Sequence, residues 1–203
     1  MIGRFVVALP FLIAISATAS PASTDRAITG QLCRGAVCFP RQVETAGRTL
    51  DLHGAALFTY WGFEVYSAAL YTTQPGVQRG TRILSGDSPV RLELHYHRNV
   101  NRRDIIRASE TMLRENAFVN YAAIEDSWRT FQRLLRDVGE GDRYTILLIP
   151  GQGIELQLNG VEIGRVDHPE FAAAYLRIWL CDTYPINETM RDKLLARRAG
   201  DYR

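Results

Sequence analysis

Residues 143–163 alternate short apolar runs with tight turns, and this block limits the chain to a small set of folds. Segments 143–149 and 154–158 each have the length and apolar content of one strand. Asn159-Gly160 then separates the second segment from residues 161–163. An Asn-Gly pair between alternating apolar residues is typical of a type I′ hairpin, because both central residues of that turn need a positive φ. The block therefore predicts three antiparallel strands in chain order.

Three earlier segments, 49–58, 62–71 and 90–97, also carry strand patterns, and the last of them alternates most regularly. A period of two with one apolar face is typical of an antiparallel sheet whose other face meets solvent. We expect the apolar face of 90–97 to point inward and its polar face to be exposed. The apolar face consists of Leu92, Leu94 and Tyr96, and the polar face of Arg91, Glu93, His95 and His97.

Four segments show helical spacing or helix-capping signals. We expect a helix over 102–116 capped by Asn101, an amphipathic helix over 122–137, a helix after Asp167-His168, and a last helix over 187–197. Strands outnumber helices, and the helices come in pairs. This order indicates an α+β fold, an open-faced β-sandwich in which helices pack on one face of a large antiparallel sheet. The arginine stripe on the second helix is interleaved with acids and indicates a solvated face; it consists of Arg129, Arg133 and Arg136.

The first 19 residues have the order of a secretory signal peptide: Arg4, a short apolar core and the small residues Ala17-Thr18-Ala19. We expect cleavage after Ala19 and a periplasmic or secreted protein. Residues 20–47 are then a leader with short strands, and 48–203 form the domain. The formal net charge of +2 favours neither nucleic acid nor an anionic membrane, and no second apolar stretch is long enough to span a membrane.

Cys33 and Cys38 flank a short turn, and an oxidising compartment favours a disulfide between them. Cys181 lies in an apolar helical stretch and is expected to be a buried free thiol. No spaced second cysteine pair points to a zinc site.

Three stretches together resemble the chalcone isomerase-like family. They are the strand opening at 52–58, the aromatic strand at 61–71, and the hairpin at 156–164 with the helix 171–180 ending in Ile-Trp-Leu. Their order and spacing are similar to the exported bacterial branch of the family. The resemblance covers residues 48–197 and implies a large antiparallel sheet, a helical layer and a small-molecule cleft between the two.

The resemblance also implies which side chains would carry the isomerase reaction. The plant enzyme uses an arginine for the attacking phenoxide and hydroxyls for the developing enolate, which are electrostatic roles. The arginine position falls on Phe58, one threonine position falls near Tyr66, and a later threonine position falls on Ile178. We therefore expect no chalcone isomerase activity, no catalytic residues of that type and no cofactor.

The family also contains non-catalytic fatty-acid binders, in which the same arginine pairs with the ligand carboxylate. Phe58 would instead suit a neutral or aromatic ligand, or a filled cleft. The candidate lining residues are Phe58, Tyr60, Tyr66 and Ile178, with Trp61 beside them. Ordinary strand packing is the alternative reading of these aromatic residues.

Two other functions remain open from the sequence, and a metal site is not expected. One is an isomerase or lyase with a different residue set, such as Tyr66 with His95. Another is an accessory protein that docks a partner on the polar face of 90–97. His95 and His97 could bind a metal only with a third ligand, and the sequence fixes the distance of none; the candidates are His53, Glu93 and His168.

Overall fold

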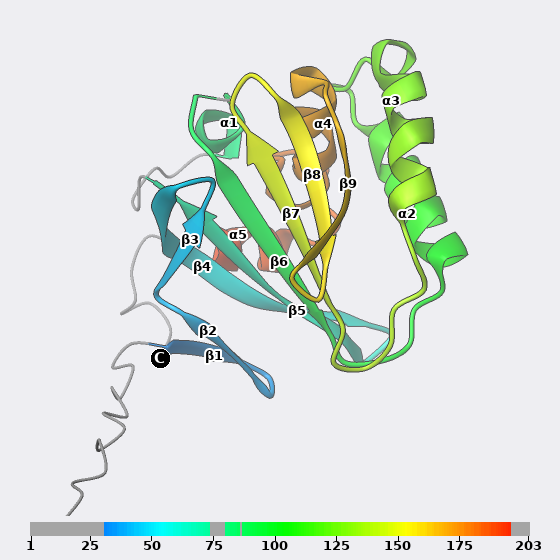
Figure 1. Cartoon of the computed structure of the whole chain (residues 1–203). Coiled ribbons are helices and arrows are strands. Elements are labelled where there is room, and N and C mark those ends of the chain that lie inside the picture. Colours follow the sequence, from blue (N-terminus) through cyan, green and yellow to red (C-terminus); the bar gives the residue numbers. More distant parts are fainter. Residues whose placement is uncertain (1–30, 74–79, 86, 196–203) are drawn as a thin grey trace, which may run out of the picture.

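The structure, a computed structural model, describes residues 31–73, 80–85 and 87–195. Seven antiparallel strands form one curled sheet in chain order, which confirms the predicted α+β architecture (Figure 1). They are β3 (Gln42–Thr45), β4 (Arg48–Tyr60), β5 (Phe63–Thr72), β6 (Val90–Tyr96), β7 (Arg143–Ile149), β8 (Gly153–Leu158) and β9 (Val161–Val166). Because β3 pairs with β4, the sheet includes a strand that lies before residue 48, in the segment expected to be a leader with short strands.

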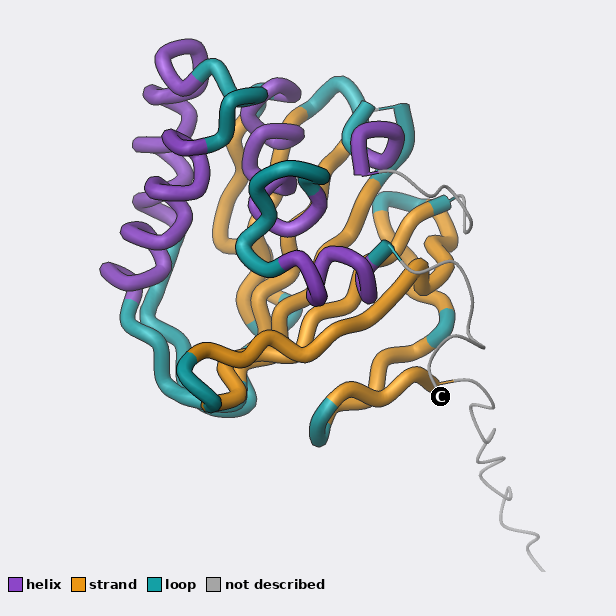
Figure 2. Tube along the Cα trace, turned by 180° about the vertical axis from the view of Figure 1, so that it is seen from behind, coloured by secondary structure: helices purple, strands orange, loops and turns teal. Residues whose placement is uncertain are grey.

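The helices lie on one side of the sheet, as Figure 2 shows from behind. α4 packs on β7 and β8, and α5 packs on β4, while α2 and α3 stand as a pair beside β9. The helices within the described residues are α1 (Gly80–Ile83), α2 (Arg102–Glu115), α3 (Tyr121–Leu134), α4 (Pro169–Leu180) and α5 (Glu188–Leu194). None of the described helices is both long and apolar enough to cross a membrane.

Where the start of α2 meets the end of α3, the structure corrects two details of the prediction. The side chain of Asn101 makes no capping hydrogen bond, although the residue stands at the N-cap of α2. The carboxylate of Asp137 instead accepts a hydrogen bond from the Arg102 backbone N–H at 2.6 Å. An acid at this position satisfies an orphan amide and meets the positive end of the helix dipole. α3 ends at Leu134, three residues earlier than expected, and Asp137 lies beyond its end.

The interior between the sheet and the helices is built from the inward sides of β5–β8 and from α3 and α4. Leu92, Leu94 and Tyr96 all point into it, as the alternation of β6 predicts. Four buried rings from the two helices pack together there, with centroids 4.6 to 6.4 Å apart: Trp128, Phe131, Phe171 and Tyr175. Burial of such rings is the main stabilising contribution of an interior of this kind.

Three two-residue turns join neighbouring strands of the sheet: Ala46-Gly47, Trp61-Gly62 and Asn159-Gly160. Both central residues of each turn have positive φ, which is the type I′ geometry. The predicted Asn159-Gly160 turn is confirmed, with φ of 54° and 82°. The Asn159 side chain accepts from the Arg143 backbone N–H at 2.8 Å and donates to Asp142 at 2.8 Å. This turn is therefore explained by its own local chemistry.

A separate hairpin of β1 (Gln31–Arg34) and β2 (Val37–Pro40) covers part of the sheet face that the helices leave open. Its buried residues Leu32 and Phe39 belong to a second, smaller apolar cluster. The other members of that cluster are Leu50, Ala55, Ala69 and Tyr71. The predicted disulfide between Cys33 and Cys38 joins the two strands, and both cysteines face solvent. Cys181 is a buried free thiol, as expected.

Several expectations fall on parts of the chain outside the described residues. These are the signal peptide over residues 1–19, the first part of the leader and the end of the last helix. Within the described part, α5 begins after Asn187, whose side chain accepts from the Met190 backbone N–H at 2.8 Å.

Candidate functional site

The end of β4 carries the residue on which the functional prediction depends. Phe58 is half-buried and lies opposite Tyr66 of β5, and the two rings stack with centroids 4.9 Å apart. Tyr66 is buried and points toward the helices, as Tyr96 does on the next strand. The position that the family resemblance assigns to an arginine is thus occupied by a ring packed on another ring.

The Tyr66 hydroxyl makes its contact with helix α4. The Trp179 indole N–H donates to this hydroxyl at 3.0 Å, and Ile178 is buried in the same interior. Burial raises the pKa of Tyr66, the Trp179 hydrogen bond opposes that rise, and Tyr175 adds to it. Neither Trp179 nor Tyr175 carries a charge. The structure therefore brings Phe58, Tyr66 and Ile178 into one apolar interior, with a neutral phenol beside Trp179.

Further rings continue from Tyr66 through the interior. Tyr96 lies edge-on to Tyr66 at 5.6 Å and to Tyr144 at 6.0 Å, while Tyr175 lies edge-on to Trp179 at 5.6 Å. The space beneath Phe58 is therefore occupied largely by aromatic side chains, and an apolar guest would have to displace part of this packing. Any guest of such an interior would be held by dispersion and exclusion of water rather than by charge.

Tyr60, another predicted lining residue, lies apart from this interior. Its side chain is 63% exposed, next to Trp61 at the tip of the β4–β5 hairpin. A register shift between Phe58 and Thr59 interrupts the strand alternation that would place residues 58 and 60 on the same face.

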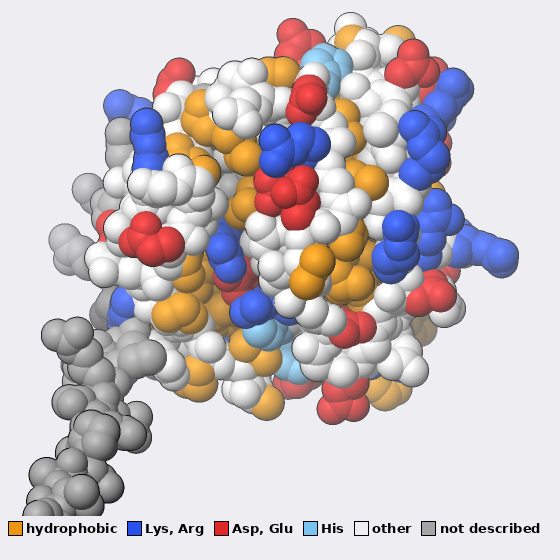
Figure 3. Space-filling model, in the orientation of Figure 1, with side chains coloured by type: hydrophobic (Ala, Val, Ile, Leu, Met, Phe, Trp, Pro, Cys, Tyr) orange, Lys and Arg blue, Asp and Glu red, His pale blue; other side chains and the backbone are white. Residues whose placement is uncertain are grey.

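The polar face of β6 is not the exposed surface that the alternation predicts. Glu93 is only 2% exposed, and its carboxylate accepts from Arg91 Nε at 2.7 Å, with Arg91 Nη2 at 2.6 Å. His95 lies 3.5 Å from the same carboxylate and edge-on to Phe39 of the covering hairpin at 5.3 Å. In Figure 3, basic, acidic and histidine side chains gather between the β1–β3 segment and β7–β9. The expectation of a wet face is therefore wrong, because Glu93 is buried in its ion pair with Arg91 and the β1–β2 hairpin lies over His95 and His97.

The charges around Glu93 outweigh the cost of its burial. Burial alone would raise the pKa of this carboxyl, but the contact with His95 and the guanidinium groups of Arg91 and Arg143 bring the pKa below its usual range. The network of Glu93, Arg91, Arg143 and His95 therefore favours the ionised form of Glu93 in the folded protein.

The structure does not support the geometry that two alternative functions need, a Tyr66–His95 catalytic pair and a docking surface on the polar face of β6. Tyr66 and His95 point to opposite faces of the sheet, since the register pairs Tyr66 with Tyr96 and Ser67 with His95. A catalytic pair of Tyr66 and His95 is therefore wrong. The docking face is also reduced, because Glu93 is buried and His97 lies 2.8 Å from the Ser67 hydroxyl beneath the β1–β2 turn.

The candidate metal ligands are dispersed. His95 contacts Glu93, His97 contacts Ser67, and His168 Nδ1 lies 2.7 Å from the Ser127 hydroxyl. No group of three potential metal ligands comes together in the part of the chain that the structure describes.

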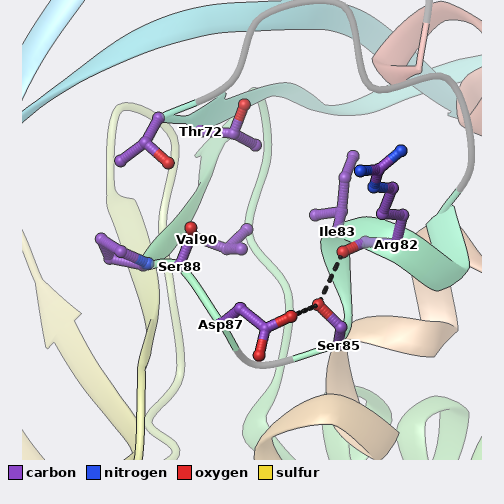
Figure 4. A pocket seen from close by; sticks show the side chains of 9 residues that line it. Thr72, Arg82, Ile83, Ser85, Asp87, Ser88 and Val90 are labelled. Atoms are coloured by element: carbon purple, nitrogen blue, oxygen red, sulfur yellow. Dashed lines mark hydrogen bonds between the residues drawn. The ribbon is translucent and has the colours of Figure 1, made fainter.

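A small pocket that the sequence did not reveal lies at the other end of β5, beside α1 (Figure 4). It has a volume of about 130 Å³, and the Ser85 hydroxyl lies there within hydrogen-bond distance of two acceptors, an Asp87 carboxylate oxygen at 2.7 Å and the Arg82 carbonyl oxygen at 3.0 Å. Thr72 and Thr73 add hydroxyl groups to its lining. None of the predicted lining residues contributes to it.

The fold and its aromatic interior define the chain as an α+β protein in which helices back a single antiparallel sheet. A family model described as chalcone isomerase-like matches residues 34–196. Because this match takes in most of the sequence, the chain belongs to the chalcone isomerase-like family.

A solved structure supports the same fold. The crystal structure of a fatty-acid binding protein of Arabidopsis thaliana is similar to this chain with a TM-score of 0.62 and 13% sequence identity. The similarity covers 82% of this chain and 96% of the plant protein. A search of curated protein sequences found no match.

Proposed function

We propose that this chain is an exported, non-catalytic binding protein that holds a small apolar, uncharged ligand between its sheet and its helices. The observation that carries this proposal is the stack of Phe58 on Tyr66, whose hydroxyl is paired with the Trp179 indole.

The same arrangement argues against ring-closing chemistry. That reaction needs a cation to stabilise a phenoxide and polar groups to stabilise an enolate. Phe58 supplies no charge, and burial raises the pKa of Tyr66, which keeps its phenol protonated at neutral pH. Ile178 offers neither a donor nor an acceptor in its side chain. The three positions are suited to apolar contact.

Ligand binding is supported by the fatty-acid binding of the structural neighbour and by the composition of the interior's border. Half-buried apolar side chains pack against the interior from β4, β5 and α2; they include Phe58, Val65, Ile105, Ile106 and Met112. We infer that an apolar chain enters when the Phe58 ring rotates off the Tyr66 ring on which it stacks. A free carboxylate would be desolvated there without a cation, so neutral alcohols, esters or aromatic compounds fit better than fatty acids.

Phe58→Arg tests this assignment. For the wild type we expect dodecanol to bind at least tenfold more tightly than dodecanoate, measured by titration calorimetry. In the arginine variant the preference should reverse, because a guanidinium pairs with a carboxylate through two hydrogen bonds, and bonds to charged groups contribute about 1.5–3 kcal/mol.

Phe58→Leu is the matched control, since it keeps an apolar side chain and should keep the preference for the alcohol. Native mass spectrometry of the purified wild type should also show a bound uncharged lipid or aromatic compound. Absence of binding for both dodecanol and dodecanoate, with no co-purifying compound, would contradict the proposal.

Export is tested separately. When the full chain is expressed in a Gram-negative bacterium, we expect the mature protein to be recovered from the periplasm or medium, beginning at Ser20. N-terminal sequencing and fractionation measure this directly. An intact chain that stays in the cytoplasm would contradict the export part of the proposal and leave ligand binding to be decided by the titration.

A further inference from the structure

The turn between β4 and β5 has an unusual residue for its backbone. Trp61 and Gly62 have φ of 51° and 80°, close to the 54° and 82° of Asn159 and Gly160. Asn159 fits this conformation and makes two hydrogen bonds through its side chain. A bulky residue with positive φ is a strained outlier, and the Trp61 side chain is 83% exposed. Local structure therefore does not explain why a tryptophan stands here.

The neighbours of Trp61 extend the same pattern. Tyr60 and Phe63 pair across the turn and are 63% and 61% exposed. These three residues, which we call the aromatic tip, make up half of the six large apolar side chains that are exposed among the described residues. The Arg98 guanidinium lies 4.9 Å from the centre of the Phe63 ring. Figures 1 and 2 show this end of β4 and β5 at the edge of the molecule, away from α4 and α5.

We propose that the aromatic tip docks the protein on the surface of a lipid bilayer, with its three rings in the headgroup layer and Arg98 beside the phosphates. Tryptophan and tyrosine favour this layer because their rings are apolar and their N–H and O–H groups remain hydrated. A convex tip of three side chains is small for a protein partner, because a standard interface uses roughly 20–30 residues on each side.

The charges near the aromatic tip determine which lipid composition should be used to test the docking. Arg98 and Glu64 are both exposed, so the tip carries no strong excess of either sign. Docking should therefore depend on the rings and occur on neutral phosphatidylcholine vesicles. It needs no ligand in the interior and stands or falls independently of the proposed binding function.

Tryptophan fluorescence of the full chain gives a specific readout. The sequence has three tryptophans, and Trp128 and Trp179 are buried. We expect phosphatidylcholine vesicles to shift the emission to shorter wavelength, and brominated phosphatidylcholine to quench it, through Trp61 alone. Vesicle flotation should show at least a tenfold loss of binding for Trp61→Asn.

The asparagine variant also separates docking from folding. Asparagine favours the type I′ conformation, so Trp61→Asn should unfold at a higher urea concentration than the wild type while it loses vesicle binding. Phe118→Ala is the matched control, because Phe118 is 62% exposed on another part of the molecule and should keep wild-type binding.

Three results would overturn the proposal. The first is an absence of vesicle binding by the wild type. The second is an equal loss of binding in the Phe118 and Trp61 variants. The third is a concentration-dependent blue shift without vesicles that Trp61→Asn removes, which would assign the tip to self-association instead.

Discussion

Replacement of Glu93 by alanine is expected to lower the free energy of unfolding by about 3–5 kcal/mol, the usual cost of removing one partner from a buried ion pair. Glu93 lies beside His95, which contacts Phe39 of the β1–β2 hairpin, and its carboxylate accepts from Arg91 Nε at 2.7 Å. Without the carboxylate, the Arg91 guanidinium would stay mostly buried near Arg143 with no acid to balance it. Urea unfolding of both proteins at pH 7 measures the difference.

The double variant Arg91→Met/Glu93→Leu is the informative control. When both charges of this pair are replaced by apolar side chains of similar size, only Arg143 loses its acid, and its side chain is 36% exposed to water, so most of the lost stability should return. A double variant as unstable as Glu93→Ala would show that shape rather than charge pairing holds this part of the sheet.

The pH dependence gives a second check on the same network. The pKa of Glu93 is lower in the folded protein than in the unfolded chain, so its contribution is fully present above the unfolded pKa of about 4.3 and is lost as pH falls through the lower folded value. The wild type should therefore lose more stability below about pH 4.3 than Glu93→Gln does. Equal pH profiles would contradict the lowered pKa.

Glu93 also shows where sequence reasoning about the fold stops. The alternation of residues 90–97 correctly predicts a strand and its inward face, because the period depends on local backbone geometry. Whether the other face is wet depends on a partner from elsewhere in the chain. Here that partner is β1–β2, whose Phe39 contacts His95 from more than fifty positions away. A strand whose polar face is covered and a strand whose polar face meets solvent show the same alternation of polar and apolar residues.

The residues of the candidate site could likewise be predicted only in part. Phe58, Tyr66 and Ile178 could be grouped from the family resemblance, and the structure brings them into one interior. Tyr60 could not be placed, because a register shift after Phe58 changes the alternation. The turn at Trp61 could not be predicted from its residues either, because tryptophan is not a preferred residue at positive φ. The pairing of β4 with β5 imposes this turn instead.

The second large effect is expected at Gly54 in β4, where alanine should lower the free energy of unfolding by about 3 kcal/mol, the upper end of the usual cost of overpacking. A Cβ on Gly54 would overlap the backbone oxygens of Lys193 and Leu194 in α5. The obstacle is backbone rather than a flexible side chain, so α5 would have to move away from the sheet. That movement would also pull the fully buried Leu194 out of the interior.

Gly139→Ala is the control for the loss of glycine itself. A Cβ there meets only the ends of the Asn99 and Asp142 side chains, at 3.4 and 3.6 Å, which are ordinary van der Waals distances. We expect that variant to stay within about 0.5 kcal/mol of the wild type in urea unfolding, as surface substitutions usually do. If Gly54→Ala were equally neutral, the close backbone contact between α5 and β4 would not fix the position of this helix. Its position would then depend on the packing of the Met190 and Leu194 side chains.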